Sequence, residues 1–371
     1  MDNYDVAIIG AGIAGSSLAI LLAQAGKSVV VFEKHSLPSH KVCGEFISLE
    51  TYSFFESIGL QVGEWNLPII KNLKLTSQKG TVLEDKLKVG GFGVSRYKLD
   101  FELCKLMQSS GVKVYTNEKV MSASADSLKT QHRTVKAKLV VGSHGKYSPS
   151  YISSLHSKPL SKKFIGVKYH IKGDFEEDLI SLHSFDGGYC GISKIEDDLY
   201  CLCYLVDAQK LKHNNNDISL LEKKVLSKNI HLNQVISKAT YVWKKPLVIS
   251  NIQFDKNQIV QNGILFCGDS AGSISPLSGN GMSIAARTGL LLSQVILNNK
   301  DKQLMELQYE KNWDRLFNPK IKKAKFLNYI MLNPNIHDVI LNLLKFIRPL
   351  RRKTINDMQG EPFVRETKLI L

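Results

Sequence analysis

The chain has 371 residues, of which 43% are hydrophobic and 22% are charged, an ordinary composition for a globular protein that can bury a sizeable core in one or two domains. Its formal net charge of +15 favours acidic partners, namely phosphate-bearing cofactors, anionic membrane surfaces or acidic carrier proteins. The lysines are spread along the chain and no nucleic-acid-binding signature is present, so we expect no nucleic-acid partner. The six cysteines form no CxxC pair and show no metal-type spacing with histidine, which predicts free thiols in a reducing cytoplasm and no metal site.

The first 33 residues have the pattern of a βαβ nucleotide-binding unit. Residues 4–9 predict a buried strand, residues 10–15 read GAGIAG, residues 16–25 predict a helix, and residues 28–32 predict a second strand that ends at Glu33. The apolar stretch 7–26 resembles a membrane span in composition, but its glycines favour a strand, a turn and a helix. The strand begins close to Met1 without a basic leader or a cleavage site, so we expect no secretion.

Each part of this unit has a physical reason. Gly10 permits a tight turn, Gly12 lets a pyrophosphate approach the backbone, and Gly15 permits close helix packing. The helix N-terminus offers free N–H groups to phosphates, and Glu33 is placed to accept hydrogen bonds from ribose hydroxyls. A plain glycine turn would leave the glycine spacing and the acid unexplained, so the sequence predicts an adenine-dinucleotide site.

The next segments alternate between the two predicted parts of the fold. A polar loop over 34–49 precedes a helix over 49–58, and it would place Cys43 near the ring end of the cofactor, either as a redox or acid group or as a small packing residue. Residues 69–89 alternate like paired strands of a second sheet. A helix is predicted from Arg96 to about residue 110, and Arg96 either reaches the cofactor pyrophosphate or lies on the surface beside a helix cap.

The middle of the chain predicts further strands of the nucleotide-binding domain and then, from about residue 161, a sheet-rich substrate domain. Strands are expected at 112–115 and 120–125, and an apolar strand over 137–142 enters a turn at Gly145. Residues 164–248 are mostly strand-like, with one helix over 219–227. Cys201 and Cys203 point to one face of a strand, which favours core packing.

A second cofactor segment follows at residues 263–282. A buried strand ends in the turn of Gly268 and Asp269, and the run PLSGNGM at 276–282 precedes a helix over 283–297. Asp269 is placed to bind polyol hydroxyls of the cofactor. The N–H groups of residues 279–282 would face the ring atoms on which charge develops during reduction.

Together these motifs resemble the flavoprotein monooxygenase superfamily with the para-hydroxybenzoate hydroxylase fold, and within it the geranylgeranyl reductase-like branch. The resemblance rests on GAGIAG with Glu33, on residues 96–100, on the Gly145 turn, and on CGDSAG at 267–272 with its continuation. The Cys43-Gly44 loop is similar to the Cys-Gly loop of the reductase branch. The fold class implied is α/β (α+β overall), with a Rossmann-like FAD-binding domain, an inserted mostly antiparallel sheet domain and a C-terminal helical segment.

The expected FAD-binding parts are 1–68, 93–160 and 253–300, the substrate parts are 69–92 and 161–252, and the helical region is 301–371. From the motifs and the resemblance we predict FAD contacts from Gly10, Gly12, Ile13, Ala14, Gly15, Glu33, Lys34, Cys43, Gly44, Arg96, Val120, Gly145, Gly268, Asp269, Pro276, Gly279, Asn280, Gly281 and Met282. No catalytic base can be assigned, and Cys43 is the one catalytic candidate. We expect His40, His144, His170 and His183 to be structural or surface residues.

Two departures from the family pattern bear on function. His144 stands before Gly145 where the superfamily usually has aspartate, a residue implicated in FAD and nicotinamide contacts. Residues 189–193 lack the tryptophan and proline of the lipid-pocket signature of the reductase branch. Because only one dinucleotide fingerprint is present, NAD(P)H would bind transiently over the FAD, unless another protein donates the electrons.

The tail from 301 to 371 is basic, with 14 Lys and Arg against 8 Asp and Glu, a net charge of +6. Residues 335–353 predict a helix with an apolar stripe and a cluster of basic residues at its end. This helix either caps the substrate domain or lies at the inner face of a membrane.

Three functions are compatible with the sequence, and we favour the first of them. The first is an FAD-dependent monooxygenase that hydroxylates or epoxidises a hydrophobic or aromatic small molecule through a flavin C4a-hydroperoxide. The second is a reductase that saturates prenyl double bonds, and the third is a flavin-binding redox partner without turnover. The expected substrate is a hydrophobic or aromatic small molecule, lipid-like or carrier-bound, and the expected location is the cytoplasm.

Overall fold

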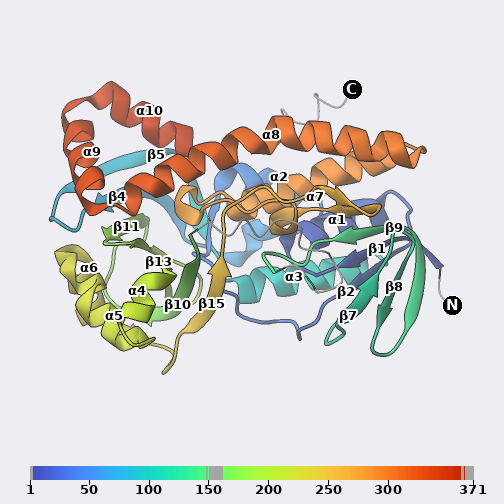
Figure 1. The fold of residues 1–371 in the computed structure, drawn as a ribbon, viewed down its shortest axis with the longest axis horizontal. Helices are drawn as coiled ribbons and strands as arrows, with labels where there is room; N and C mark the ends of the chain where they lie inside the picture. Colours follow the sequence, from blue (N-terminus) through green and yellow to red (C-terminus); the bar gives the residue numbers. More distant parts are fainter. Residues whose placement is uncertain (1–2, 148, 150–161, 361–362, 364–371) are drawn as a thin grey trace.

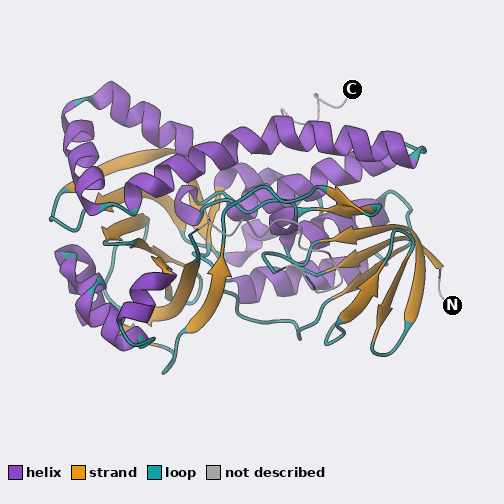
Figure 2. Cartoon of the chain, viewed as in Figure 1, coloured by secondary structure: helices purple, strands orange, loops and turns teal. Residues whose placement is uncertain are grey.

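A computed structural model of the chain describes residues 3–147, 149, 162–360 and 363. Its strands form two sheets, and helices pack around both of them, as Figures 1 and 2 show. The expectation of a mixed α/β fold with a mostly antiparallel second sheet and a helical C-terminal region is confirmed.

The first sheet is built around parallel strands in the order β17-β9-β1-β2-β6. Its central strands are buried along most of their length, as expected for a parallel sheet that helices cover. Around it, α1 packs against α3 and α7, and Gly289 permits the close approach of α7, because a Cβ there would lie 2.7 Å from the carbonyl oxygen of Ala14. The strands of this sheet are β1 (Asn3–Ile9), β2 (Val29–Phe32), β6 (Lys113–Tyr115), β7 (Val120–Ala123), β8 (Ser127–Thr130), β9 (Thr134–Gly142), β16 (Val260–Gln261) and β17 (Ile264–Phe266). The helices are α1 (Ile13–Gln24), α3 (Arg96–Ser109) and α7 (Gly281–Asn298).

The second sheet runs in the order β14-β10-β13-β12-β11-β4-β5-β3, with β15 also paired to β10. Its neighbours are antiparallel except for β11 and β4, which are parallel. Its strands are β3 (Phe46–Ser48), β4 (Ile69–Thr76), β5 (Val82–Gly93), β10 (Phe164–Lys172), β11 (Leu179–Phe185), β12 (Gly188–Lys194), β13 (Tyr200–Asp207), β14 (Thr240–Tyr241) and β15 (Leu247–Ile252). Between β3 and β4 lie a 3₁₀ turn (Leu49–Thr51), α2 (Tyr52–Ser57) and a second 3₁₀ turn (Val62–Trp65).

The helix predicted over 219–227 is present, but the prediction missed a further helix on each side of it. Residues 208–238 form α4 (Ala208–His213), α5 (Ile218–Lys224), a 3₁₀ turn (Leu226–Lys228) and α6 (Ile230–Lys238). Side chains within the segment restart the helix, because Asp217 accepts a hydrogen bond from the N–H of Leu220 and Asn229 accepts from the N–H of Leu232. Residues of these helices pack with one face of the second sheet in a hydrophobic cluster of their own.

The C-terminal region forms α8 (Lys302–Met331), α9 (Pro334–Phe346) and α10 (Arg348–Met358). In Figure 1 α8 runs along α7 and ends beside the second sheet, where α9 and α10 follow. The one helix predicted over 335–353 is therefore wrong, and the break falls at Ile347. Pro349 explains it, because a proline lacks the N–H that would bond the carbonyl of Lys345 and its ring would clash there. Among the described residues, no helix is both long and apolar enough to span a bilayer.

Candidate cofactor and substrate cavity

A cavity of about 1020 Å³ lies where the glycine-rich end of the first sheet meets the second sheet. One part of its lining comes from the start of α1, the loop over 34–46, residues 118–121 and 143–147, and the start of α7. The other part comes from the second sheet, on β11, β12, β13 and β15. The cavity thus joins the two predicted halves of the molecule.

The predicted cofactor residues converge on this cavity, although they come from segments up to 272 positions apart, from Gly10 to Met282. All of them line it except Gly15 and Asn280. Gly15 lies inside the fold instead, because a Cβ there would be 2.3 Å from the carbonyl oxygen of Gly10. Gly279 and Pro276 belong to the short turn Pro276–Ser278 and its cap, and Gly268 and Asp269 to the 3₁₀ turn Gly268–Ser270.

Four lining glycines leave space that a ligand can fill. At Gly44, Gly145 and Gly281 a Cβ would meet no protein atom within 4 Å, and at Gly12 it would meet only the Arg96 guanidinium, at 3.9 Å. No side chain caps the first turn of α1, so its N–H groups are available to an anionic ligand. This arrangement of open glycines at a helix start fits the pyrophosphate and ring of FAD.

Glu33 is fixed at the end of β2 by two backbone donors. Its Oε2 accepts a hydrogen bond from the N–H of Ala11 at 3.0 Å, and its Oε1 accepts from the N–H of His35 at 3.1 Å. The carboxylate therefore bridges the glycine turn and the loop after β2 while it lines the cavity. This is the position in which an acid can contact ribose hydroxyls.

Arg96 is not the surface arginine that one interpretation of the sequence allowed. Its side chain is 14% exposed, and Nε and a terminal nitrogen each lie 2.8 Å from the Asp100 carboxylate. Burial favours the neutral acid, but the charges of Arg96 and of Lys41, at 2.7 Å, outweigh it and hold the pKa of Asp100 below its usual value. The fixed guanidinium lies beside Gly12, where a cofactor phosphate would pass.

Cys43 lines the cavity beside the first turn of α7. Its Sγ lies 3.7 Å from the Sδ of Met282, and its carbonyl oxygen accepts a hydrogen bond from the Cys201 thiol at 3.2 Å. The Cys201 thiol on β13 therefore holds the loop that carries Cys43. Cys43 is thus a lining residue of the cavity that contacts both α7 and the second sheet.

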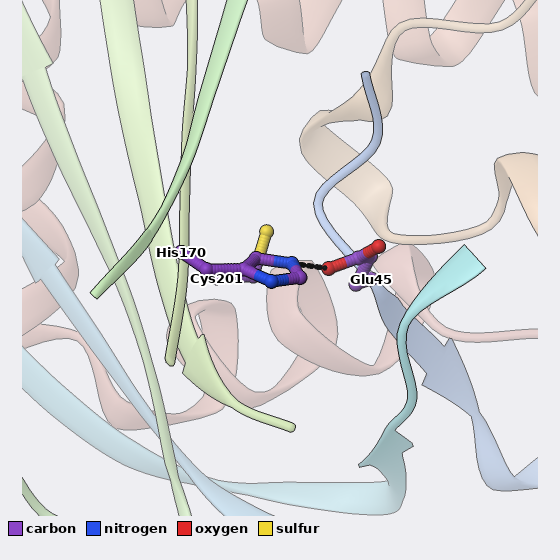
Figure 3. A group of neighbouring side chains, drawn as sticks. All are labelled: Glu45, His170 and Cys201. Atoms are coloured by element: carbon purple, nitrogen blue, oxygen red, sulfur yellow. Dashed lines mark hydrogen bonds and ion pairs between the residues drawn. The ribbon is translucent and has the colours of Figure 1, made fainter. Parts of the chain in front are cut away.

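A buried charge cluster lies behind this loop, and sequence reasoning missed it. Glu45 is fully buried and bonds to Lys168 and to the backbone N–H of Arg96 through Oε1, and to His170 through Oε2 at 2.6 Å (Figure 3). Burial raises the pKa of a carboxyl group, but His170 and the Lys168 charge outweigh it and hold the pKa of Glu45 below its usual value. Glu45 also keeps the pKa of Lys168 above its usual value, although burial opposes it.

The cluster also brings together residues that the sequence did not pair. Lys168 and His170 lie on β10, and His170 is the cross-strand neighbour of Cys201 on β13. Ligand atoms of Glu45, His170 and Cys201 lie within 4.8 Å of one another, a distance at which such groups can bind a metal (Figure 3). In this cluster the positive charge that pairs with the Glu45 carboxylate comes from the ammonium of Lys168. The available signal was a lysine in the apolar strand 164–171, because a buried lysine needs an acidic partner.

His144, the departure from the family pattern, lines the cavity with a buried ring. Burial lowers its pKa to about 4, so the imidazole is neutral at neutral pH. Neither ring nitrogen has a hydrogen-bond partner within the described part of the chain, and the ring meets Phe266 edge-on at 5.8 Å. The cavity therefore has a neutral polar group where the family usually has an anionic one.

The wall of the cavity on the second sheet is mostly apolar. Its polar members include Ser193 and Tyr189, and the buried Tyr189 hydroxyl has no hydrogen-bond partner among the residues that the structure describes. Such a wall binds hydrocarbon or aromatic surface and keeps water out. Its apolar members are Ile180, Leu182, Ile192, Leu205, Leu247, Val248, Ile249 and Ile252, and Leu277 of the turn 276–278 adds to them.

Two curated relatives align with most of the chain. Conditioned medium factor receptor 1 of Dictyostelium discoideum is 23% identical over 92% of this chain and 74% of its own length. Digeranylgeranylglycerophospholipid reductase of Picrophilus torridus is 26% identical over 88% of this chain and 86% of its own length.

Solved structures share the fold. A geranylgeranyl bacteriochlorophyll reductase-like protein of Thermoplasma acidophilum superposes with a TM-score of 0.79 and 18% identity, covering 100% of both chains. PqsL of Pseudomonas aeruginosa, described as a probable FAD-dependent monooxygenase, superposes with a TM-score of 0.71 and 15% identity over 92% of this chain and 100% of its own. At these identities the likeness shows the fold alone.

The family comparison covers the whole cofactor region. Residues 3–299 match the family described as FAD binding domain, which includes the GAGIAG run, Glu33, Arg96 and the segment from Gly268 to Met282. These are the residues that converge on the cavity. The chain therefore belongs to the FAD binding domain family, a family of FAD-dependent oxidoreductases.

Proposed function

We propose that this protein is an FAD-dependent reductase that saturates prenyl-type carbon–carbon double bonds in a lipid-like substrate. The observation that carries the proposal is the position of the Cys43 thiol. Cys43 lines the cavity, with its Sγ beside Met282 at the start of α7 and its carbonyl oxygen against Cys201 of the second sheet. A double bond held against the apolar wall of the second sheet would lie between a reduced flavin and a proton donor.

The reaction needs a hydride for one alkene carbon and a proton for the other. Bound FAD, once reduced, supplies the hydride. Cys43 donates its Sγ proton to the second carbon, which completes the saturated bond, and the thiolate then recovers a proton from water. The Cys201 thiol and the Glu45 cluster hold the Cys43 loop so that Sγ keeps its place beside Met282.

In this proposal the apolar wall of the cavity binds the substrate. An isoprenoid chain offers no group for hydrogen bonding, so its binding depends on burial of apolar surface. The wall also keeps water from the reduced cofactor. The alignment with the Picrophilus protein, over 88% of this chain, supports this substrate class, since that relative is named digeranylgeranylglycerophospholipid reductase.

A second candidate is the hydroxylation or epoxidation of a hydrophobic or aromatic molecule. The buried Tyr189 hydroxyl favours it, because an unpartnered hydroxyl in an apolar wall can orient an oxygen-bearing substrate. The fold shared with PqsL is compatible with this reaction.

Product analysis separates the two reactions. FAD-loaded protein reduced with dithionite is mixed with a geranylgeranyl glycerophospholipid, with and without oxygen, so the natural electron donor is not needed. In the absence of oxygen, we expect a product that has gained two hydrogen atoms for each double bond that is saturated. Cys43→Ser should lower the rate by about 100-fold. The matched control is Cys203→Ser, which also alters a cavity-lining thiol and should keep the rate.

Other outcomes would overturn the proposal. A product that gains an oxygen atom, formed only in air, would establish the monooxygenase. No product from any prenyl lipid or aromatic compound, with FAD bound and reducible, would favour a redox partner without turnover. An unchanged rate in Cys43→Ser would remove Cys43 from the proton-donor role.

A further inference from the structure

Helix α9 is apolar on two opposite sides. His337, Leu341 and Leu344 are buried on one side. On the other side Val339 is 67% exposed and Phe346 is 86% exposed, with Leu343 between them. Within each of these two sets the residues are four and three positions apart, so they share one side of the helix. The two sets are offset by two positions, which is about 200° around an α-helix, so the sets lie on opposite sides. A helix with only one side packed normally shows polar residues to water, so the second apolar side is unexplained by the fold.

The exposed apolar side continues past the end of α9. Ile347 and Leu350 are also exposed, at the break and in the first turn of α10. We name Ile336, Val339, Leu343, Phe346, Ile347 and Leu350 the outer face. Contiguous apolar residues of this kind at a surface indicate an interaction site.

The end of the outer face lies in a basic stretch of the chain. Residues 345–353 contain Lys345, Arg348, Arg351, Arg352 and Lys353 and no acidic residue. Arg351 pairs with Asp85 at 2.7 Å, and Arg348 and Arg352 line a groove with Glu84, Asp85 and Glu176, although the four cations other than Arg351 form no ion pair with any residue that the structure describes. The occupant of the outer face must therefore offer both apolar material and negative charge.

We propose that the outer face docks on a lipid bilayer with anionic headgroups. In this arrangement the exposed side chains enter the region between headgroups and acyl chains, and the basic residues contact lipid phosphates. A second copy of the chain is a poorer occupant, because a symmetric contact would bring the same unpaired cations together. The bilayer satisfies both the apolar row and the charges beside it.

The inward side of α9 connects this surface to the cavity. Leu341 and Leu344 belong to the same hydrophobic cluster as the cavity-lining residues Leu182, Leu205 and Leu277. Docking through α9 would thus hold the apolar end of the cavity close to the bilayer. This link to a lipid substrate rests on the proposed function, whereas the docking surface itself does not.

Cosedimentation with vesicles tests the docking. The FAD-loaded full chain is spun with vesicles of phosphatidylcholine alone or mixed with phosphatidylglycerol, at low salt. We expect binding to the mixed vesicles and little to phosphatidylcholine. Val339→Ser with Phe346→Ser should weaken binding at least about tenfold, through lost apolar burial. Arg348→Glu with Arg352→Glu should weaken binding to the mixed vesicles by about tenfold or more.

The matched control changes exposed apolar residues elsewhere. Ile230→Ser with Val242→Ser alters two exposed side chains outside α9, and it should bind like the unchanged protein. Flavin absorbance and thermal unfolding show that each variant is folded. Equal binding by all variants, or no binding to mixed vesicles, would overturn the proposal. A dimer in solution that the Val339 and Phe346 changes dissociate would assign the face to a second copy instead.

Discussion

At the scale of single residues, Glu45 is a charged side chain that is fully buried in the protein. Its backbone is left-handed, with φ of +54°, and its side chain is fully buried between Lys168 and His170. A buried ion pair gains little over apolar packing, but removal of one partner leaves the other charge uncompensated. The cluster therefore makes the geometry of the Cys43 loop depend on one carboxylate.

Glu45→Gln should destabilise the protein by about 3–5 kcal/mol, because Lys168 would remain buried without its counter-charge. Urea denaturation of the purified variant measures the change. The control is Glu84→Gln, which breaks the exposed pair of Lys74 and Glu84 and should cost about 1 kcal/mol or less.

A double variant checks the reason for this loss. Glu45→Gln with Lys168→Met removes both charges, so it should recover a large part of the stability lost in Glu45→Gln alone. If the double variant were less stable than the single one, the uncompensated charge would not be the cause.

The sequence could predict the glycines and the end of β2 because their roles follow from local backbone needs. Gly12 and Gly281 line the cavity as expected, and Glu33 ends β2. The Glu45 cluster could not be assembled in this way, since Glu45 is 123 and 125 positions from Lys168 and His170 and no fixed spacing links them. Their contact depends on the packing of the Glu45 loop against β10, which is a tertiary property.

At the scale of elements, α9 is held to the second sheet through a buried histidine. His337 Nδ1 lies 2.6 Å from the Ser184 hydroxyl on β11, and burial lowers the pKa of His337 to about 4. Between pH 6.5 and pH 4 the unfolded chain binds a proton at this site that the folded chain does not. Stability from this group is complete above pH 6.5 and is lost as the pH falls through that window.

Acidification from pH 7 to pH 5 should therefore cost about 2 kcal/mol through His337. Urea denaturation at both pH values measures the loss, and His337→Asn should show a loss smaller by that amount. Ser184→Ala is the control, because it removes the hydrogen bond but keeps the titrating ring, so its acid dependence should remain. Equal pH dependence in His337→Asn and the unchanged protein would contradict this assignment.

The elements were predicted unevenly, and the reasons are physical. The strands of the first sheet are continuous apolar runs, and they were found. The helical character of 301–371 was predicted but the bounds of α8 were not, although Met305, Tyr309, Trp313, Phe317 and Ile321 recur every four residues and are buried. Of the three short helices over 208–238 only the middle one was predicted, because the caps at Asp207 and Asn229 were not recognised.

At the scale of the whole molecule, one cavity connects the two sheets, and polar links join them beside it. One such link is Glu196, after β12, whose carboxylate accepts a hydrogen bond from the N–H of Ser95 at 2.8 Å, beside the cavity at the start of α3. A ligand that fills the cofactor part of the cavity contacts segments from residue 9 to residue 285. Ligand binding should therefore stabilise the fold as a unit.

FAD at 100 times its dissociation constant should raise the stability of the unloaded protein by about 2.7 kcal/mol. Thermal unfolding with and without FAD measures this rise. Gly12→Val should abolish it, because the added side chain would enter the cavity and meet only Arg96 on the protein side. Without FAD, the Gly12→Val protein should unfold at nearly the same temperature as the unchanged protein. If FAD still raised the unfolding temperature of Gly12→Val, that result would contradict the assigned cofactor site.

The central claim is that one cavity holds FAD and a prenyl double bond side by side. Its most direct test is the flavin spectrum of the reduced, FAD-loaded protein, mixed with a geranylgeranyl glycerophospholipid under strict exclusion of oxygen. We predict that the oxidised flavin band returns as the double bonds become saturated. A flavin that stays reduced with the lipid, and becomes oxidised only when oxygen is admitted, would contradict the account.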